Sequence, residues 1–116
     1  MIMAKLGMPH GRARYFRLLV DSGADYTLIS SADALLLGLD YQEIRSPETK
    51  VEVANMASIH TKKTLLTLTI ESLAFKIPVL VAKEEVECLL GRKGVFDQFD
   101  ILFQEKEGRV VFIQRD

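Results

Sequence analysis

Short apolar stretches separated by polar turn residues run along most of the chain, and several of them alternate apolar with polar positions. A period of two places every second side chain on one face, which is typical of a β-strand with one buried face. Leu66, Leu68 and Ile70 form one such face. The predicted strands are residues 14–20, 26–29, 50–53, 64–70 and 75–81, and a closing hairpin over residues 101–114 turns at residues 106–108. Pro78 has no amide hydrogen to donate, so it indicates a sheet edge or a bulge in its strand.

Only short helices interrupt this pattern. Ser30 begins a capping-box pattern, which predicts a helix over residues 32–39, and Gly38 is well placed to end it. A second short helix is expected within residues 91–100, after an apolar run over residues 86–90 that we expect to be buried. The order of these elements predicts an all-β, barrel-like domain with one or two short helices.

Composition narrows the functional classes. The 116 residues predict one domain, residues 1–116, and 48% hydrophobic residues are enough for a single core. A net charge of −1 and a pI near 6.1 give no electrostatic basis for binding nucleic acid or an anionic membrane. Cys88 is the only cysteine, which excludes an internal disulfide and favours a reducing, cytoplasmic setting. From the sequence we expect no signal peptide, spanning segment, linker or repeat.

One carboxylate has an unusual position in the sequence. Asp21 directly follows an apolar run and directly precedes Ser22, Gly23 and Ala24 in the stretch LLVDSGADYTLIS. Because a buried charge without a partner costs several kcal/mol, the sequence predicts either a partner for Asp21 or a position at an opening. An Asp-Ser-Gly triplet alone is also compatible with a plain turn. A second signal, Leu-Leu-Gly at residues 89–91, lies far downstream, and the two together are a rarer combination than either alone.

These two segments together resemble the retropepsin-like aspartic proteases, the single-domain relatives of the pepsins. LLVDSGADYTLIS, residues 18–30, looks like their catalytic loop, in which apolar residues precede Asp-Thr/Ser-Gly-Ala. LLGRKGVFDQFDILF, residues 89–103, looks like their second motif, two apolar residues and Gly-Arg followed by a helix and a closing strand. The resemblance covers about residues 12–114 in the family's order, and it implies a closed barrel of the acid-protease type.

The resemblance also implies a mechanism and a partner. Aspartic proteases hold a water between two carboxylates that share a proton, because like charges at about 3 Å cannot both ionise. The sequence contains one Asp-Ser-Gly, so the second carboxylate would be Asp21 of another copy, and the active form would be a homodimer. The Ser22 hydroxyl would form a hydrogen bond with the Asp21 loop of the other copy, and Gly23 would let a peptide backbone approach closely. Asp25 and Arg92 would form a structural ion pair within one subunit, although each is also compatible with a solvated surface charge.

The segment over residues 51–66 resembles the flap of these enzymes, a hairpin that closes over bound peptide. The residues then expected to bind substrate are Ala24, Asp25, Asn55, Met56 and Ala57, the last three at or near the flap tip. Viral flaps are rich in glycine at the tip, whereas residues 54–58 contain none. Without the resemblance the same segment predicts an ordinary hairpin.

Two alternatives stay open beside a homodimeric aspartic endopeptidase that acts on peptides or unfolded proteins. The first is a retropepsin-like module that keeps the fold and the dimer but serves binding or assembly; the glycine-free flap favours it, and the intact Asp21 motif favours the enzyme. The second is a nucleic-acid domain, because residues 91–94 match the GxxG clamp of KH domains. In that clamp a helix precedes the GxxG residues, whereas a strand-like run precedes them in this sequence.

His10 and His60 lack companions at ligand spacing, so we expect no metal and no organic cofactor.

Overall fold

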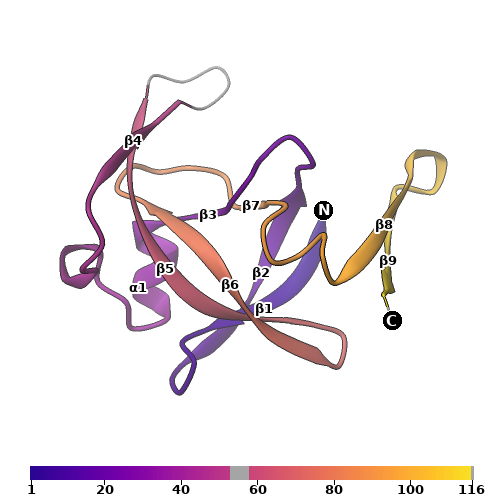
Figure 1. Ribbon diagram of the computed structural model, residues 1–116, viewed down its shortest axis with the longest axis horizontal. Coiled ribbons are helices and arrows are strands. Elements are labelled where there is room, and N and C mark those ends of the chain that lie inside the picture. The colour runs from indigo at the N-terminus through magenta and orange to yellow at the C-terminus, as the bar shows by residue number, and fades with distance from the viewer. Residues whose placement is uncertain (53–57, 116) are drawn as a thin grey trace.

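A closed β-barrel forms the body of the protein (Figure 1) in the computed structural model, which describes residues 1–52 and 58–115. The barrel strands are β1 (Ile2–Gly7), β2 (Ala13–Val20), β3 (Thr27–Ser30), β5 (Ile59–Ile70), β6 (Leu73–Ala82) and β7 (Leu89–Leu90). Their order is β1-β2-β7-β3-β6-β5, and the far end of β5 pairs back to β1 and closes the ring. Strand β4 (Thr49–Val51) pairs with the first residues of β5. The predicted all-β barrel is therefore confirmed.

The alternation of apolar and polar positions determines which side chains fill the barrel. Leu66 and Leu68 of β5 are fully buried, whereas their neighbour Leu65 points outward and is 56% exposed. Ile77 and Val79 of β6 are also fully buried. Strands with a period of two can bury only one face in a closed barrel, so the sequence pattern selects the inward set.

One α-helix and a short 3₁₀ turn cover one side of the barrel. Helix α1 (Ser31–Leu36) begins after Ser30, whose side-chain oxygen accepts a hydrogen bond from the backbone N–H of Asp33. Gly38 follows the helix with a φ of +80°, so the predicted stop is confirmed although the helix is shorter than expected. The 3₁₀ turn is η1 (Tyr41–Glu43). No helix in the described part of the chain is long and apolar enough to cross a membrane.

The expected second helix is not formed. Residues 92–98 instead make a series of hydrogen-bonded turns, including Phe96 N–H to Arg92 C=O at 2.9 Å. Gly94 has a φ of +79°, a left-handed conformation that a continuous right-handed helix cannot contain. The run over residues 86–90 also differs from the prediction, because only Leu90 of that run is buried.

Two strand details follow from the topology. Residues 2–7, for which no strand was predicted, form β1 and pair with both β2 and β5 within the same chain.

Pro78 of β6 pairs with Leu65 of β5 on one side. On its other side, β3 pairs with β6 only from Val79 onward. The proline therefore occupies a position where its missing N–H is not needed by a neighbouring strand, as predicted for a local sheet edge.

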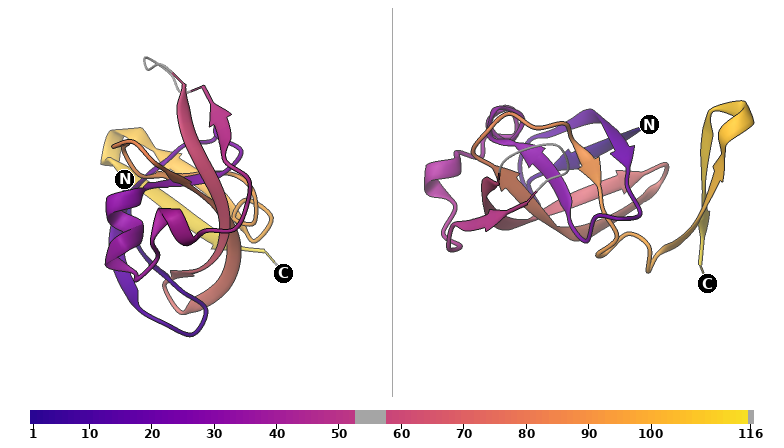
Figure 2. Two further views of the ribbon diagram at one scale, coloured as in Figure 1. Left: turned by 90° about the vertical axis from the view of Figure 1, so that its left-hand side faces the viewer. Right: turned by 90° about the horizontal axis from the view of Figure 1, so that it is seen from above.

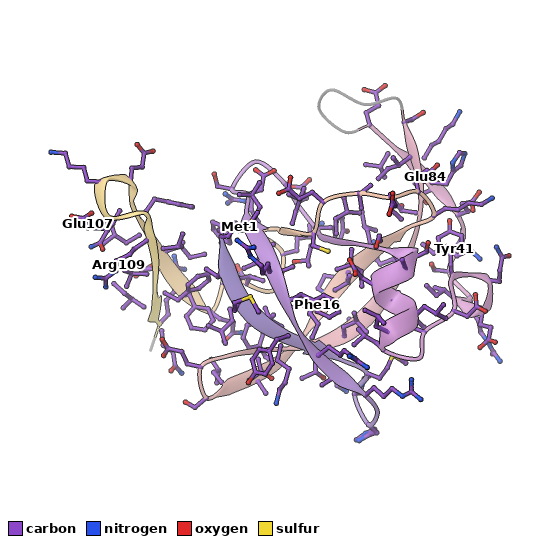
Figure 3. The ribbon with its side chains drawn as sticks, turned by 180° about the vertical axis from the view of Figure 1, so that it is seen from behind. Met1, Phe16, Tyr41, Glu84, Glu107 and Arg109 are labelled. Atoms are coloured by element: carbon purple, nitrogen blue, oxygen red, sulfur yellow. The ribbon has the colours of Figure 1, made fainter. Side chains whose placement is uncertain are left out.

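The C-terminal hairpin stands apart from the barrel (Figure 2). It consists of β8 (Phe99–Gln104) and β9 (Arg109–Gln114), joined by the 3₁₀ turn η2 (Glu105–Glu107), and it forms its own two-stranded sheet. Phe99 anchors its base, because this ring is buried in the core and lies 5.9 Å from the ring of Phe75. Figure 3 shows Glu107 and Arg109 at the far end of the hairpin and Met1 on the side of the barrel nearest to it.

Candidate active site

Asp21 lines a cavity of the protein and directly follows β2. One of its carboxylate oxygens, Oδ1, accepts a hydrogen bond of 2.9 Å from the backbone N–H of Gly23. Its own N–H donates to the carbonyl of Leu90 at 3.0 Å. The side chain is half-buried and takes part in no ion pair among the described residues. The carboxylate thus avoids the cost of a buried lone charge by accepting one backbone hydrogen bond and facing an opening.

Backbone hydrogen bonds join the two sequence motifs into one unit. In addition to the bond between Asp21 and Leu90, Leu19 N–H donates to the carbonyl of Cys88 at 3.1 Å. Beyond the loop, Arg92 N–H donates to the carbonyl of Ala24 at 2.9 Å. The downstream segment therefore supports the Asp21 loop from both sides, which explains why both motifs occur together in the sequence.

Gly91 makes this junction possible. A Cβ added at Gly91 would lie 2.3 Å from the carbonyl carbon of Tyr26, so only glycine fits between the two backbones. The N–H of Gly91 donates to the side-chain oxygen of Thr27 at 3.1 Å, and Thr27 is fully buried. Sequence reasoning did not identify Thr27, because a lone threonine at the start of a strand carries no distinguishing signal.

The cavity has a volume of about 1120 Å³ and is bounded by the Asp21 loop, the β4–β5 region and the segment before β7. Of the residues predicted for the site, those that line it are Asp21, Gly23, Ala24 and Asp25. Ser22 is exposed beside it. Asn55, Met56 and Ala57 lie outside the described residues, so their predicted role at a flap tip stays a prediction. Apolar side chains including Leu19 and Leu89 form part of the wall, as is usual for ligand-binding cavities.

The predicted Asp25–Arg92 ion pair is not formed. Among residues 1–52 and 58–115 the ion pairs are His60–Glu84 and Arg115–Asp100. The Arg92 guanidinium instead lies over the ring of Phe96, with 5.3 Å from Cζ to the ring centroid, and is 3.5 Å from the carbonyl oxygen of Ser22. The physical reason is a competing contact, because the Arg92 side chain packs over Phe96 and lies near the Ser22 carbonyl instead of Asp25.

A cluster of Tyr26, Lys63 and Lys93, which we call the lysine–tyrosine cluster, lies beside Asp25. The Tyr26 hydroxyl oxygen accepts hydrogen bonds from the ammonium groups of Lys63 at 3.0 Å and Lys93 at 3.2 Å. These two hydrogen bonds lower the pKa of Tyr26, and the bond to Tyr26 raises the pKa of Lys93. No sequence pattern indicated this cluster, because its members come from three segments that only the fold brings together.

Other reactive side chains near the site are bound in structural contacts. The Cys88 thiol donates to Asp33 Oδ2 at 3.0 Å, and burial, followed by this hydrogen bond, raises the pKa of Cys88 to about 12, so the thiol stays protonated and unreactive at neutral pH. His60 Nδ1 lies 2.7 Å from Glu84 Oε2, and this hydrogen bond lowers the pKa of Glu84. The described residues contain no group of three His, Cys, Asp or Glu side chains arranged to hold a metal ion.

Comparisons with known proteins agree with this geometry. A family model described as gag-polyprotein putative aspartyl protease matches residues 11–93. A retropepsin-like aspartic protease from Rickettsia conorii is similar in structure, with a TM-score of 0.68 and 21% identity over 90% of this chain and 75% of that chain. The EIAV protease complexed with the inhibitor HBY-793 has a TM-score of 0.55 and 20% identity over 78% of this chain and 79% of that chain. No curated protein sequence matches the chain. The two solved structures confirm the predicted closed-barrel fold.

Proposed function

The chain belongs to the gag-polyprotein putative aspartyl protease family and has the retropepsin-like fold, and from this premise we propose that it is a homodimeric aspartic endopeptidase. Its substrates would be peptides or unfolded proteins, bound in a groove to which each subunit contributes one cavity. Asp21 of each subunit would supply one of the two catalytic carboxylates, without a metal or an organic cofactor.

The position of Asp21 carries this proposal. The carboxylate opens onto a cavity of about 1120 Å³, it is held by the Gly23 N–H, and no second acid in the described residues forms a hydrogen bond with it. In a dimer the two Asp21 side chains would share one proton and hold one water. The ionised carboxylate would then take a proton from the attacking water while the protonated one donates to the amide carbonyl oxygen.

The C-terminal hairpin supports a dimer. An isolated two-stranded sheet is marginal in water, yet this one extends away from the barrel and pairs with no other strand in the described part of the chain. Both of its faces carry exposed apolar side chains: Leu102 and Ile113, at 48% and 52% exposure, lie on one face, and Phe103, at 46%, lies on the other. A second copy would cover these side chains and the open strand edges.

Hydrolysis and assembly can be tested together. We expect the purified protein to have the molar mass of a dimer by light scattering and to cleave unfolded casein at about pH 4 to 6, with inhibition by a pepstatin-type compound. A confirmed dimer that cleaves nothing over this range would instead support the binding or assembly module.

Disrupting the hairpin should abolish activity without unfolding the barrel. We expect the double variant Leu102→Asp and Ile113→Asp to be monomeric and to lose cleavage by at least about 100-fold, because two charges on one face of the hairpin oppose burial against a second copy. The matched control is Leu35→Asp with Leu36→Asp, since these two side chains are also exposed, at 59% and 45%, but lie on α1 (Figure 1). A hairpin variant that stays dimeric and active would contradict this interface.

A further inference from the structure

The lysine–tyrosine cluster brings two ammonium groups to one oxygen atom. Besides the two hydrogen bonds to the Tyr26 hydroxyl, the Lys63 and Lys93 nitrogens lie 4.5 Å and 4.6 Å from the centroid of the Tyr26 ring. Cation–π contacts of this kind orient an ammonium group but do not neutralise it. Two like charges are thus held close together around one phenol oxygen.

Neither Lys63 nor Lys93 forms an ion pair with an acidic side chain of residues 1–52 or 58–115. The ion pairs in the part of the chain that the structure describes are His60–Glu84 and Arg115–Asp100. Asp25 acts on Lys93 only through a weaker, longer-range attraction, which is the smallest contribution to its raised pKa. The hydrogen bonds from Lys63 and Lys93, followed by the attraction of their charges, lower the pKa of Tyr26, which shows that this place favours a negative charge. A negative group placed here would therefore meet two ammonium groups that take part in no ion pair among the described residues.

Part of the cluster lies in the same cavity as Asp21. Tyr26 and Lys63 both line it, and Lys93, which is not a lining residue, reaches it through its hydrogen bond to the Tyr26 hydroxyl. The backbone fixes the place of the cluster along the wall, because Lys93 N–H donates to the carbonyl of Asp25 at 2.8 Å and Lys63 N–H donates to the Ser46 hydroxyl at 2.8 Å. A peptide bound in this cavity beside Asp21 would therefore also lie beside Tyr26 and Lys63.

Acidic side chains also line the cavity, so only one part of its wall favours a negative group. The cavity is lined by four acidic residues of the described part of the chain, Asp21, Asp25, Glu52 and Glu87. The cavity as a whole therefore does not favour the binding of anions. The cationic charge is confined to the wall where Lys63 contacts Tyr26. A single carboxylate on the peptide is therefore favoured at one position and disfavoured near the other acids.

We propose that the lysine–tyrosine cluster is a specificity subsite that selects a carboxylate at one position of the bound peptide. This inference rests on the proposed function, since it assigns a substrate preference to the same groove. The carboxylate would accept hydrogen bonds from both ammonium groups, which would then share their donors between the ligand and the Tyr26 oxygen. The selected group is an Asp or Glu side chain, or the carboxylate at the end of a peptide chain.

Binding can be measured without relying on hydrolysis. The probes are octapeptides with Leu-Phe at the centre and alanine elsewhere, amidated at the C-terminus and labelled with an uncharged fluorophore, in which Glu or Gln is placed at each flanking position in turn. Fluorescence anisotropy with the Asp21→Asn protein is expected to show about fivefold tighter binding of Glu than Gln at one position, with the difference shrinking as salt is added. A free-acid peptide series separates a chain-end carboxylate from a side chain.

Matched variants assign the preference to the cluster. Lys63→Gln combined with Lys93→Gln should remove the preference, and Lys63→Arg combined with Lys93→Arg should keep it. The control is Lys62→Gln, because Lys62 makes the same kind of contact with the ring of Tyr41, at 4.7 Å, and does not line the cavity. Equal binding of Glu and Gln at every position, no binding of any peptide, or a preference that survives both glutamine substitutions would overturn the inference. Casein cleavage by the unmutated protein tests the proposed function separately.

Discussion

Replacing Asp21 with asparagine is expected to abolish peptide hydrolysis while leaving the fold and the dimer intact. An amide cannot serve as the base that takes a proton from water, and its loss removes a contribution of roughly 10²- to 10⁴-fold to the rate. The side-chain oxygen of the introduced asparagine can still accept the hydrogen bond from the Gly23 N–H, so the loop should keep its shape. The measurement is the rate of casein cleavage, together with the melting temperature and the molar mass of the variant.

Two comparisons make this result specific. Asp97→Asn changes the charge by the same amount at an exposed residue outside the cavity, and it should cleave like the unmutated protein. Because the proposed active site takes one Asp21 from each chain, an excess of the Asp21→Asn protein, after subunit exchange, should also suppress the activity of the unmutated protein. Unchanged activity in such a mixture would rule out a site shared between two chains.

Several strands and the Asp21 loop could be predicted because they depend on local sequence. Alternation of apolar and polar residues predicted β5 and β6, since each strand must bury one face whatever its neighbours are. The position of a carboxylate at an opening, directly after β2, followed from the cost of burying a charge. Glycine at residue 91 marked the second motif, although the sequence did not show that Tyr26 is the backbone it touches.

Features that depend on long-range contacts could not be predicted. Strand β7 has only two residues, and its place between β2 and β3 results from pairings with segments far away in the chain. The Asp25–Arg92 pair was wrong because the resemblance supplied the residue types but not the competing contact between Arg92 and Phe96. The helix expected within residues 91–100 was wrong because the left-handed Gly94, which also packs against Ile77, ends any regular helix there.

Lys63 shows the same limit at the candidate site. Its neighbour Lys62 has an identical side chain one residue away, but it points to the other face of β5 and contacts Tyr41 instead of Tyr26. The sequence shows only two consecutive lysines and does not distinguish their surroundings. Which of them enters the cavity depends on the register of β5 with β6, which is a property of the whole sheet.

Substituting Gly91 with alanine should destabilise the protein more than any of the other substitutions proposed for this chain. The added Cβ would lie 2.3 Å from the Tyr26 carbonyl carbon and 2.4 Å from its oxygen, and a backbone atom cannot turn away as a flexible side chain can. The two segments must separate, which breaks the hydrogen bond from the Gly91 N–H to Thr27 and weakens those around it. We expect a loss of about 3 kcal/mol or more in the free energy of unfolding.

Thermal unfolding with a matched glycine separates this effect from a general cost of replacing glycine. A loss of this size predicts a melting temperature lower by roughly 10 °C or more. Gly11→Ala is the control, because it lies in the exposed turn between β1 and β2, where the nearest atom is the Met8 side-chain Cβ at 3.0 Å, and we expect a cost below about 1 kcal/mol. Cleavage by Gly91→Ala should fall even below its melting temperature, since Asp21 receives its support from the displaced segment through the carbonyl of Leu90. If Gly91→Ala melts within a few degrees of the unmutated protein, the close contact between the two motifs does not hold the Asp21 loop, and the support for Asp21 must come from another part of the barrel.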